Sequence, residues 1–106
     1  MITIMIRYRG KGDNARLFAQ EMIQTKLVDQ IRAEEGNLRY EYFFPHDDKE
    51  SVLLVDSWTN QEALDAHHHS PLMAEIAALR EKYDLYMEVE KYAPIEDEND
   101  ARYIRK

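Results

Sequence analysis

The sequence contains no cysteine, which excludes disulfide bonds, thiolate nucleophiles, cysteine-ligated zinc and iron–sulfur clusters. This absence also suits a reducing compartment, and we expect a cytoplasmic protein. Basic residues are in deficit, with 14 Lys and Arg against 21 Asp and Glu and a formal net charge of -7. An acidic chain repels phosphate backbones, so no nucleic acid partner is expected. No apolar run approaches the roughly 20 residues that span a bilayer, so no membrane partner is expected either.

Glycine is also scarce, with three residues in 106. Gly10 and Gly12 follow an alternating apolar segment at 2–9 and predict a turn between a strand and a helix. They lack the spacing of a phosphate-binding loop. Gly36 predicts the end of a long helix that begins near Asn14. The apolar stripe of that helix rotates near residues 24–26, which predicts either a bend or a change of packing partner there.

Strands are predicted at 37–44, 51–58 and about 85–92, with two helices between the last two. Thr59 with Glu62 has the spacing of a capping box, and Ser70 before Pro71 predicts a second helix start. The resulting order, strand, helix, strand, strand, helix, strand, predicts an α+β fold of the ferredoxin-like βαββαβ type. Residues 1–93 form this predicted domain, and residues 94–106 form a charged tail.

The segment 51–58 is apolar on both faces, with Leu53 and Val55 opposite Leu54 and Trp58. Helices cover only one face of a ferredoxin-like sheet, so the other face would remain too apolar for water. A second copy of the sheet is the simplest cover, and we therefore expect a homodimer.

Three motifs carry a family resemblance: E-E-G-N-L-R-Y-E-Y-F at 34–43, W-T-N-Q-E-A-L-D-A-H at 58–67 and S-P-L-M at 70–73. Together they resemble the antibiotic biosynthesis monooxygenase superfamily of dimeric α+β barrels. The resemblance implies oxidation of a small phenol or quinol by dioxygen, with no cofactor and no metal. It extends from about Ile2 to Tyr92 and leaves the tail outside.

Other chemistries occur in the superfamily. Haem-degrading members have an Asn on the first strand, a Trp where this chain has His67, and a His where it has Ala77, so this branch does not match. An isomerase of phosphorylated autoinducer-2, a keto sugar derivative, shares the first motif but typically has Tyr in place of Trp58. A non-catalytic ligand-binding dimer is the third alternative.

His67 is the predicted catalytic base, because it lies on the helix ridge of Leu64 and imidazole suits proton transfer at neutral pH. The alternative is a structural role, as a half-buried, hydrogen-bonded histidine. Consecutive residues of a helix point about 100° apart. His67, His68 and His69 therefore do not converge on one metal ion, and no metal site is expected. The remaining candidates are predicted to bind substrate, with core packing or a solvated strand position as their alternatives: Trp58, Tyr40, Tyr42, Leu64 and Arg39.

Overall fold

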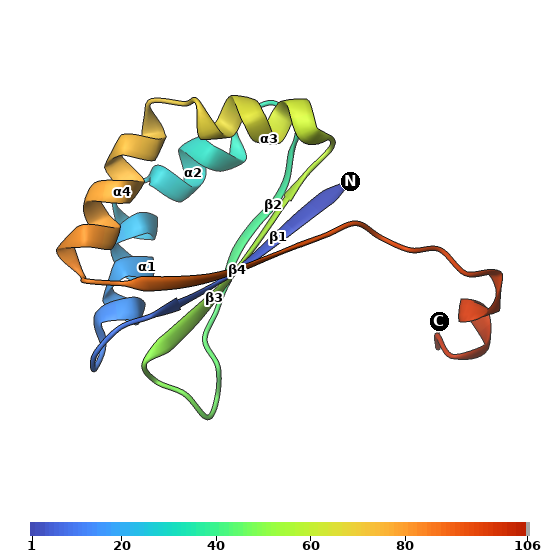
Figure 1. The fold of residues 1–106 in the computed structure, drawn as a ribbon, viewed down its shortest axis with the longest axis horizontal. Helices are drawn as coiled ribbons and strands as arrows, with labels where there is room; N and C mark the ends of the chain where they lie inside the picture. The colour runs from blue at the N-terminus through green and yellow to red at the C-terminus, as the bar shows by residue number, and fades with distance from the viewer. Residues whose placement is uncertain (106) are drawn as a thin grey trace.

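The computed structural model describes residues 1–105, which form one four-stranded sheet with helices on one of its faces (Figure 1). The elements follow one another as β1 (Ile2–Arg9), α1 (Asn14–Gln24), α2 (Leu27–Arg32), β2 (Asn37–Phe43), β3 (Ser51–Trp58), α3 (Gln61–His68), α4 (Leu72–Lys82) and β4 (Tyr86–Tyr92), with a 3-10 turn, η1, at Glu98–Arg102. No helix within residues 1–105 is both long and apolar enough to pass through a membrane.

The strands lie in the order β2-β3-β1-β4, and every neighbouring pair is antiparallel. This is the topology of the ferredoxin-like split βαβ fold, so the predicted fold class is confirmed. The central strand β3 sets the register: Leu54 lies opposite Ile6 on β1 and Tyr42 on β2. These side chains point toward the helices and begin the hydrophobic core. The core continues through α1, α2, α3 and α4 with Phe18, Met22, Ile31, Leu64 and Ile76.

The predicted long helix is two helices, and the single-helix prediction is wrong. Thr25 and Lys26 separate α1 from α2, and Lys26 has a left-handed backbone with φ of 68°. The break lies where the apolar stripe rotates, and the two helices bury different stripes. Phe18 and Met22 of α1 are fully buried, while α2 buries Leu27 and Ile31 after the turn. A straight helix would have brought only one of these stripes onto the sheet.

The start of α3 also differs from the prediction. The N-cap is Asn60, whose side chain accepts a hydrogen bond from the N–H of Ala63, so the predicted Thr59 cap is wrong. The N–H of Thr59 instead donates to the carbonyl of Gly36 and ties α3 to the start of β2. At α4, the Ser70 hydroxyl accepts from the N–H of Leu72. Ser70 therefore satisfies a free N–H at the helix start as expected, although α4 begins one residue later.

Two strand predictions need correction. A register irregularity between Asn37 and Arg39 leaves Leu38 54% exposed, although regular alternation along 37–44 would place it on the same face as Tyr40. On the edge strand β4, Met87 and Val89 lie on the helix side of the sheet but remain exposed, because the helices do not extend over this edge. They lie on the inward face that alternation along 85–92 predicts, but they are not buried there.

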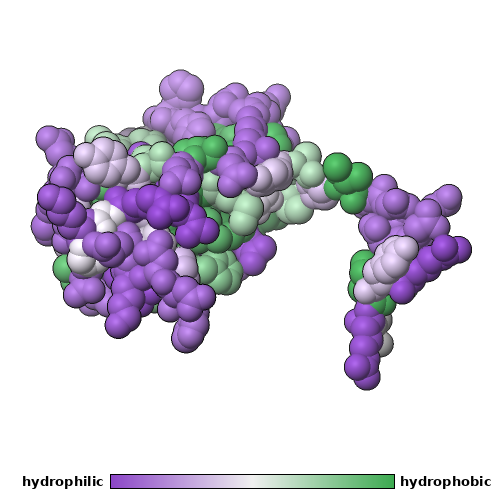
Figure 2. All heavy atoms as spheres, turned by 60° about the horizontal axis from the view of Figure 1, so that its bottom comes forward, coloured by the Kyte–Doolittle hydropathy of each residue, from purple (hydrophilic) through white to green (hydrophobic). Residues whose placement is uncertain are grey.

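The tail leaves the domain after β4 and stands clear of it (Figures 1 and 2). Its side chains from Ala93 to Arg105 are exposed, and its only regular element is η1, which Asp97 caps through the N–H of Asn99. Figure 2 shows apolar residues on the domain surface near the point where the tail departs. Lys106 lies outside the described residues. The division into a 1–93 domain and a 94–106 tail stays a prediction.

Candidate functional site

The candidate site is the layer between β3 and the helices at the end of the sheet where α3 begins. Trp58 ends β3 there, and the two-residue connection Thr59–Asn60 turns the chain into α3. Two turns later, His67 points back onto the sheet and is 4% exposed. The imidazole stacks on the indole of Trp58, with ring centroids 4.7 Å apart and 28° between the ring planes. The short connection thus fixes which helix residue meets the end of the strand.

The hydrogen-bond partner of His67 is Glu34, which lies between α2 and β2. Nδ1 of His67 lies 2.9 Å from Oε1 of Glu34, and the two side chains are 4% and 20% exposed. An ionised carboxylate only accepts, so Nδ1–H donates and Nε2 is the nitrogen that can take up a proton. The alternative of a half-buried, hydrogen-bonded histidine is right about the hydrogen bond but not about the burial, because His67 is buried. These surroundings also suit a base.

Tyrosines line the same layer. The ring of Tyr40 lies edge-on to His67 at 6.4 Å and edge-on to Tyr42 at 5.9 Å. Burial raises the pKa of both phenols, so neither ionises near neutral pH. Tyr8 of β1 is fully buried, and its hydroxyl accepts a hydrogen bond from Arg80 at 3.2 Å. The layer is therefore aromatic, largely dry and edged by a guanidinium group from α4.

Asp56 is the second carboxyl of the site. It lies on β3 between Leu54 and Trp58, faces the helices and is 4% exposed. Burial raises its pKa to about 6, and the charge of His67 and the indole of Trp58 partly offset this shift. Within residues 1–105, Oδ1 of Asp56, Nε1 of Trp58 and the hydroxyl of Tyr42 are buried without a hydrogen-bond partner. Unpartnered buried polar atoms are uncommon and mark places where a ligand or water would be held.

Of the predicted site residues, the structure brings together Trp58, Tyr40, Tyr42 and His67, with Leu64 buried one turn before the imidazole. It places Arg39 elsewhere. Arg39 lies on the opposite face of β2, is solvent-exposed and pairs with Glu41 at 3.0 Å.

Sequence reasoning missed Glu34, Asp56, Tyr8 and Arg80. For Asp56 the signal was present, because it shares the strand alternation of Leu54 and Trp58. Glu34 carried no comparable local signal.

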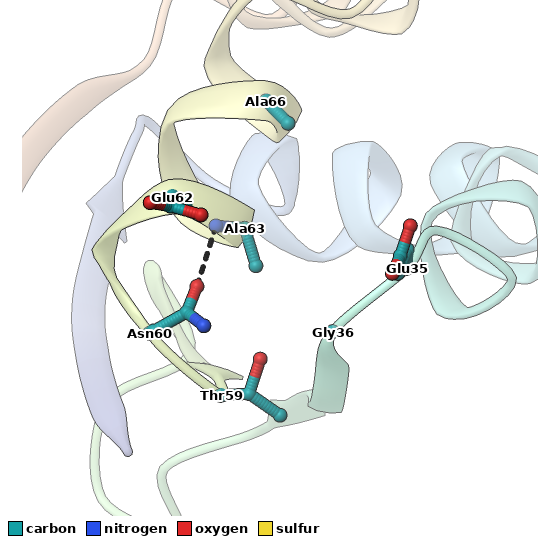
Figure 3. Close-up of a pocket in the computed structure, with 7 residues that line it drawn as sticks. All are labelled: Glu35, Gly36, Thr59, Asn60, Glu62, Ala63 and Ala66. Atoms are coloured by element: carbon teal, nitrogen blue, oxygen red, sulfur yellow. Dashed lines mark hydrogen bonds between the residues drawn. The ribbon is translucent and has the colours of Figure 1, made fainter.

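A surface cavity of about 270 Å³ lies between the start of β2 and the first turns of α3 (Figure 3). Gly36 and Thr59 form its floor, and the α3 side chains of Ala63 and Ala66 form the opposite wall. Glu34 immediately precedes the cavity residues Glu35 and Gly36, and Ala63 lies one turn before His67. Two further surface hollows, of about 370 and 310 Å³, are lined by Tyr42 and Tyr40 of the cluster itself. Trp58 and Tyr40 are nevertheless almost closed to solvent.

The family model for antibiotic biosynthesis monooxygenases matches residues 1–79. The chain belongs to this family. No curated protein matches it significantly.

Solved structures show the same fold. SnoaB from Streptomyces nogalater, named a cofactor-independent oxygenase, is 16% identical with a TM-score of 0.74, covering 92% of this chain and 95% of its own. Rv0793 from Mycobacterium tuberculosis is 21% identical with a TM-score of 0.72, covering 92% and 99%. A Deinococcus radiodurans protein provisionally assigned as an antibiotic biosynthesis monooxygenase is 16% identical with a TM-score of 0.78, covering 92% and 95%. At such identities these likenesses concern the fold, and the reaction must be argued from the site.

Proposed function

We propose that this protein is a cofactor-free monooxygenase that oxidises a small phenol or quinol with dioxygen. Family membership and the fold shared with an oxygenase named as cofactor-independent support this class of reaction. The observation that carries the proposal is the Glu34–His67 pair stacked on Trp58. It supplies an oriented base inside an aromatic layer, which is what deprotonation of a flat phenolic ring requires.

In this proposal His67 takes the hydroxyl proton of the substrate through Nε2. Glu34 holds Nδ1–H and stabilises the imidazolium that forms, because an acceptor carboxylate favours the charged ring. The resulting phenolate is electron-rich enough to pass an electron to dioxygen. The buried surroundings of Trp58 and Tyr40 exclude water and strengthen these electrostatic interactions.

We also infer a homodimer. The sheet face away from the helices carries half-buried Met5 and Leu53, buried Val55 and exposed Phe43. No helix within residues 1–105 covers it. Burying a contiguous apolar face against a second copy removes it from water at about 25 cal/mol per Å².

The isomerase alternative has less support. A phosphorylated substrate calls for cations at the site. Arg9 instead pairs with Glu88 and Asp48 at the sheet edge, Arg7 donates to Ser51 on the far face, and Arg39 pairs with Glu41. Arg80 reaches the layer between sheet and helices, where it donates to the hydroxyl of Tyr8, and Arg32 donates to the carbonyl of Tyr40. The non-catalytic alternative is favoured by the closure of the cluster around Trp58, and it predicts ligand binding without turnover.

Oxygen uptake with a panel of naphthols and hydroquinones tests the proposal. Wild-type protein should consume oxygen with at least one of them. His67→Ala should lower turnover about a hundredfold or more, the usual effect of losing a general base. His68→Ala and His69→Ala are the matched controls and should be nearly silent, because both side chains are exposed. No uptake across the panel, or full activity in His67→Ala, would contradict the assignment.

A further inference from the structure

The mechanism above leaves the buried carboxyl of Asp56 without a role. Asp56 occupies the middle of the sheet, with Ile4 and Tyr40 opposite it on the neighbouring strands. Within residues 1–105 no Lys, Arg or His forms an ion pair with it, and its Oδ1 has no hydrogen-bond partner. A buried carboxyl costs free energy unless it is paired, so its presence calls for an explanation.

The groups that interact electrostatically with Asp56 come from several elements. His67 of α3 favours its ionised form, while Glu34 disfavours it. The negative charge of Asp56 in turn disfavours ionisation of three tyrosines on β1 and β2. Arg80 of α4 donates a hydrogen bond to the hydroxyl of one of these, Tyr8. The tyrosines are Tyr8, Tyr40 and Tyr42. With burial the largest influence, Asp56 stays partly protonated far closer to neutral pH than an ordinary aspartate.

Three buried polar atoms on this side of the sheet lack a well-aligned hydrogen bond: Oδ1 of Asp56, Nε1 of Trp58 and the hydroxyl of Tyr42. The indole of Trp58 is still close enough to favour the ionised form of Asp56. They come from β2 and β3, on the face of the sheet where Trp58 stacks on His67. An aromatic ligand carrying oxygen atoms would satisfy them, and an apolar ligand would leave them unpaired.

We propose that Asp56 is a second catalytic residue, which donates a proton to the peroxide formed on the ring of a phenolic substrate and then takes up the ring proton. This inference rests on the proposed function and extends it. It also narrows the substrate class to phenols and naphthols that carry hydrogen on the carbon to be oxidised.

The steps balance without an added reductant. His67 takes the hydroxyl proton, the phenolate passes one electron to dioxygen, and the two radicals combine to form a carbon–oxygen bond. Protonated Asp56 gives its proton to the outer peroxide oxygen. Asp56 carboxylate then removes the ring proton, the C–H electron pair forms a carbonyl, and the oxygen–oxygen bond breaks. The departing hydroxide takes the proton from His67, so one phenol and one dioxygen give one quinone and one water.

The experiment compares Asp56→Asn with His67→Gln in the full chain, using 4-nitrophenol as an optical probe of ionisation and a naphthol deuterated at the reacting carbon for turnover. In Asp56→Asn, bound 4-nitrophenol should ionise as in wild type, because His67 is intact. Turnover should fall about a hundredfold or more, and the deuterium isotope effect should rise as loss of the ring proton becomes limiting. His67→Gln should instead lose ionisation of the probe.

Each result decides the matter. If Asp56→Asn turns over as fast as wild type, the role of Asp56 is wrong but the proposed function stands. The same conclusion follows if that variant no longer ionises the bound probe. Failure of wild-type protein to take up oxygen with any phenol overturns the proposed function and this inference with it. If the asparagine variant does not fold, Asp56→Ala allows the same comparison, because it removes the acid without burying an amide.

Discussion

His67 lies against Trp58 with ring centroids 4.7 Å apart, although one residue belongs to a helix and the other ends the central strand. The two-residue connection and the Asn60 cap set the phase of α3, so the turn that carries His67 faces the sheet. Stacking fixes the ring plane, and the hydrogen bond to Glu34 fixes its rotation within that plane. The orientation of the imidazole is therefore built from three separate segments of the chain.

The role of Glu34 can be tested with a nearly isosteric change. Glu34→Gln keeps the shape and a hydrogen-bonding oxygen but removes the charge that stabilises an imidazolium. We expect the protein to stay folded and the rate of oxygen uptake to fall about tenfold or more. Glu81→Gln is the matched control, because Glu81 is an exposed acid on α4, away from the candidate site. Equal activity of both variants would show that Glu34 only packs against the ring.

Asp56→Asn should stabilise the fold, and the gain should depend on pH. The folded-state pKa of about 6 lies above the unfolded value of about 3.8, so the folded state binds the proton more tightly. Wild-type stability is therefore highest below the lower value and falls as pH rises through this window. A neutral asparagine does not show this loss. At pH 7 the variant should therefore be more stable than wild type by about 3 kcal/mol, and near pH 3.5 the difference should vanish.

Urea unfolding at several pH values measures this difference directly. Asp65→Asn serves as the control, because Asp65 is an exposed acid on α3. A gain that does not change with pH would mean that Asp56 stays ionised in the folded protein. Such a result would also remove the protonated acid on which its proposed catalytic role depends. A stabilised but inactive variant would fit the usual conflict between stability and activity at a functional site.

The sequence predicted the sheet and the position of His67 because both depend on local periodicity. Alternation along 51–58 assigns Leu54 and Trp58 to one face, and the structure confirms that both are buried. The break at Lys26 could be located but not described, because nothing in the sequence signals a left-handed lysine. The contact between Glu34 and His67 could not be predicted, for a different reason. It meets His67 across 33 positions, and only the packing of α2 and α3 on one sheet brings them together.

Gly36 should be intolerant of any side chain. Its φ is +82°, and an added Cβ would lie 2.5 Å from the Cβ of Ala63 and 2.8 Å from Oγ1 of Thr59. Gly36→Ala should therefore cost about 1–3 kcal/mol and push α3 away from β2. Gly12→Ala is a strict control, because Gly12 has φ of +56° but nothing within 4 Å of an added Cβ. The difference between their melting temperatures isolates the contact with α3, and equal losses would show that this contact costs nothing.

The last prediction concerns the uncovered sheet face and separates assembly from folding. Phe43 lies on this face and is 40% exposed within one chain, so Phe43→Asp should leave the single-chain fold intact. In a dimer built on this face, the same change buries an unpaired charge, which costs several kcal/mol. Sedimentation at micromolar concentration should give twice the chain mass for wild type and the single mass for Phe43→Asp. Ile23→Asp is the control, because Ile23 is 50% exposed on α1 and this change should leave the dimer unchanged.

Val55→Asp should damage both folding and assembly, because Val55 is buried within the single chain, at 7% exposure. A folded wild-type monomer, or a dimeric Phe43→Asp variant, would show that this face is not the interface.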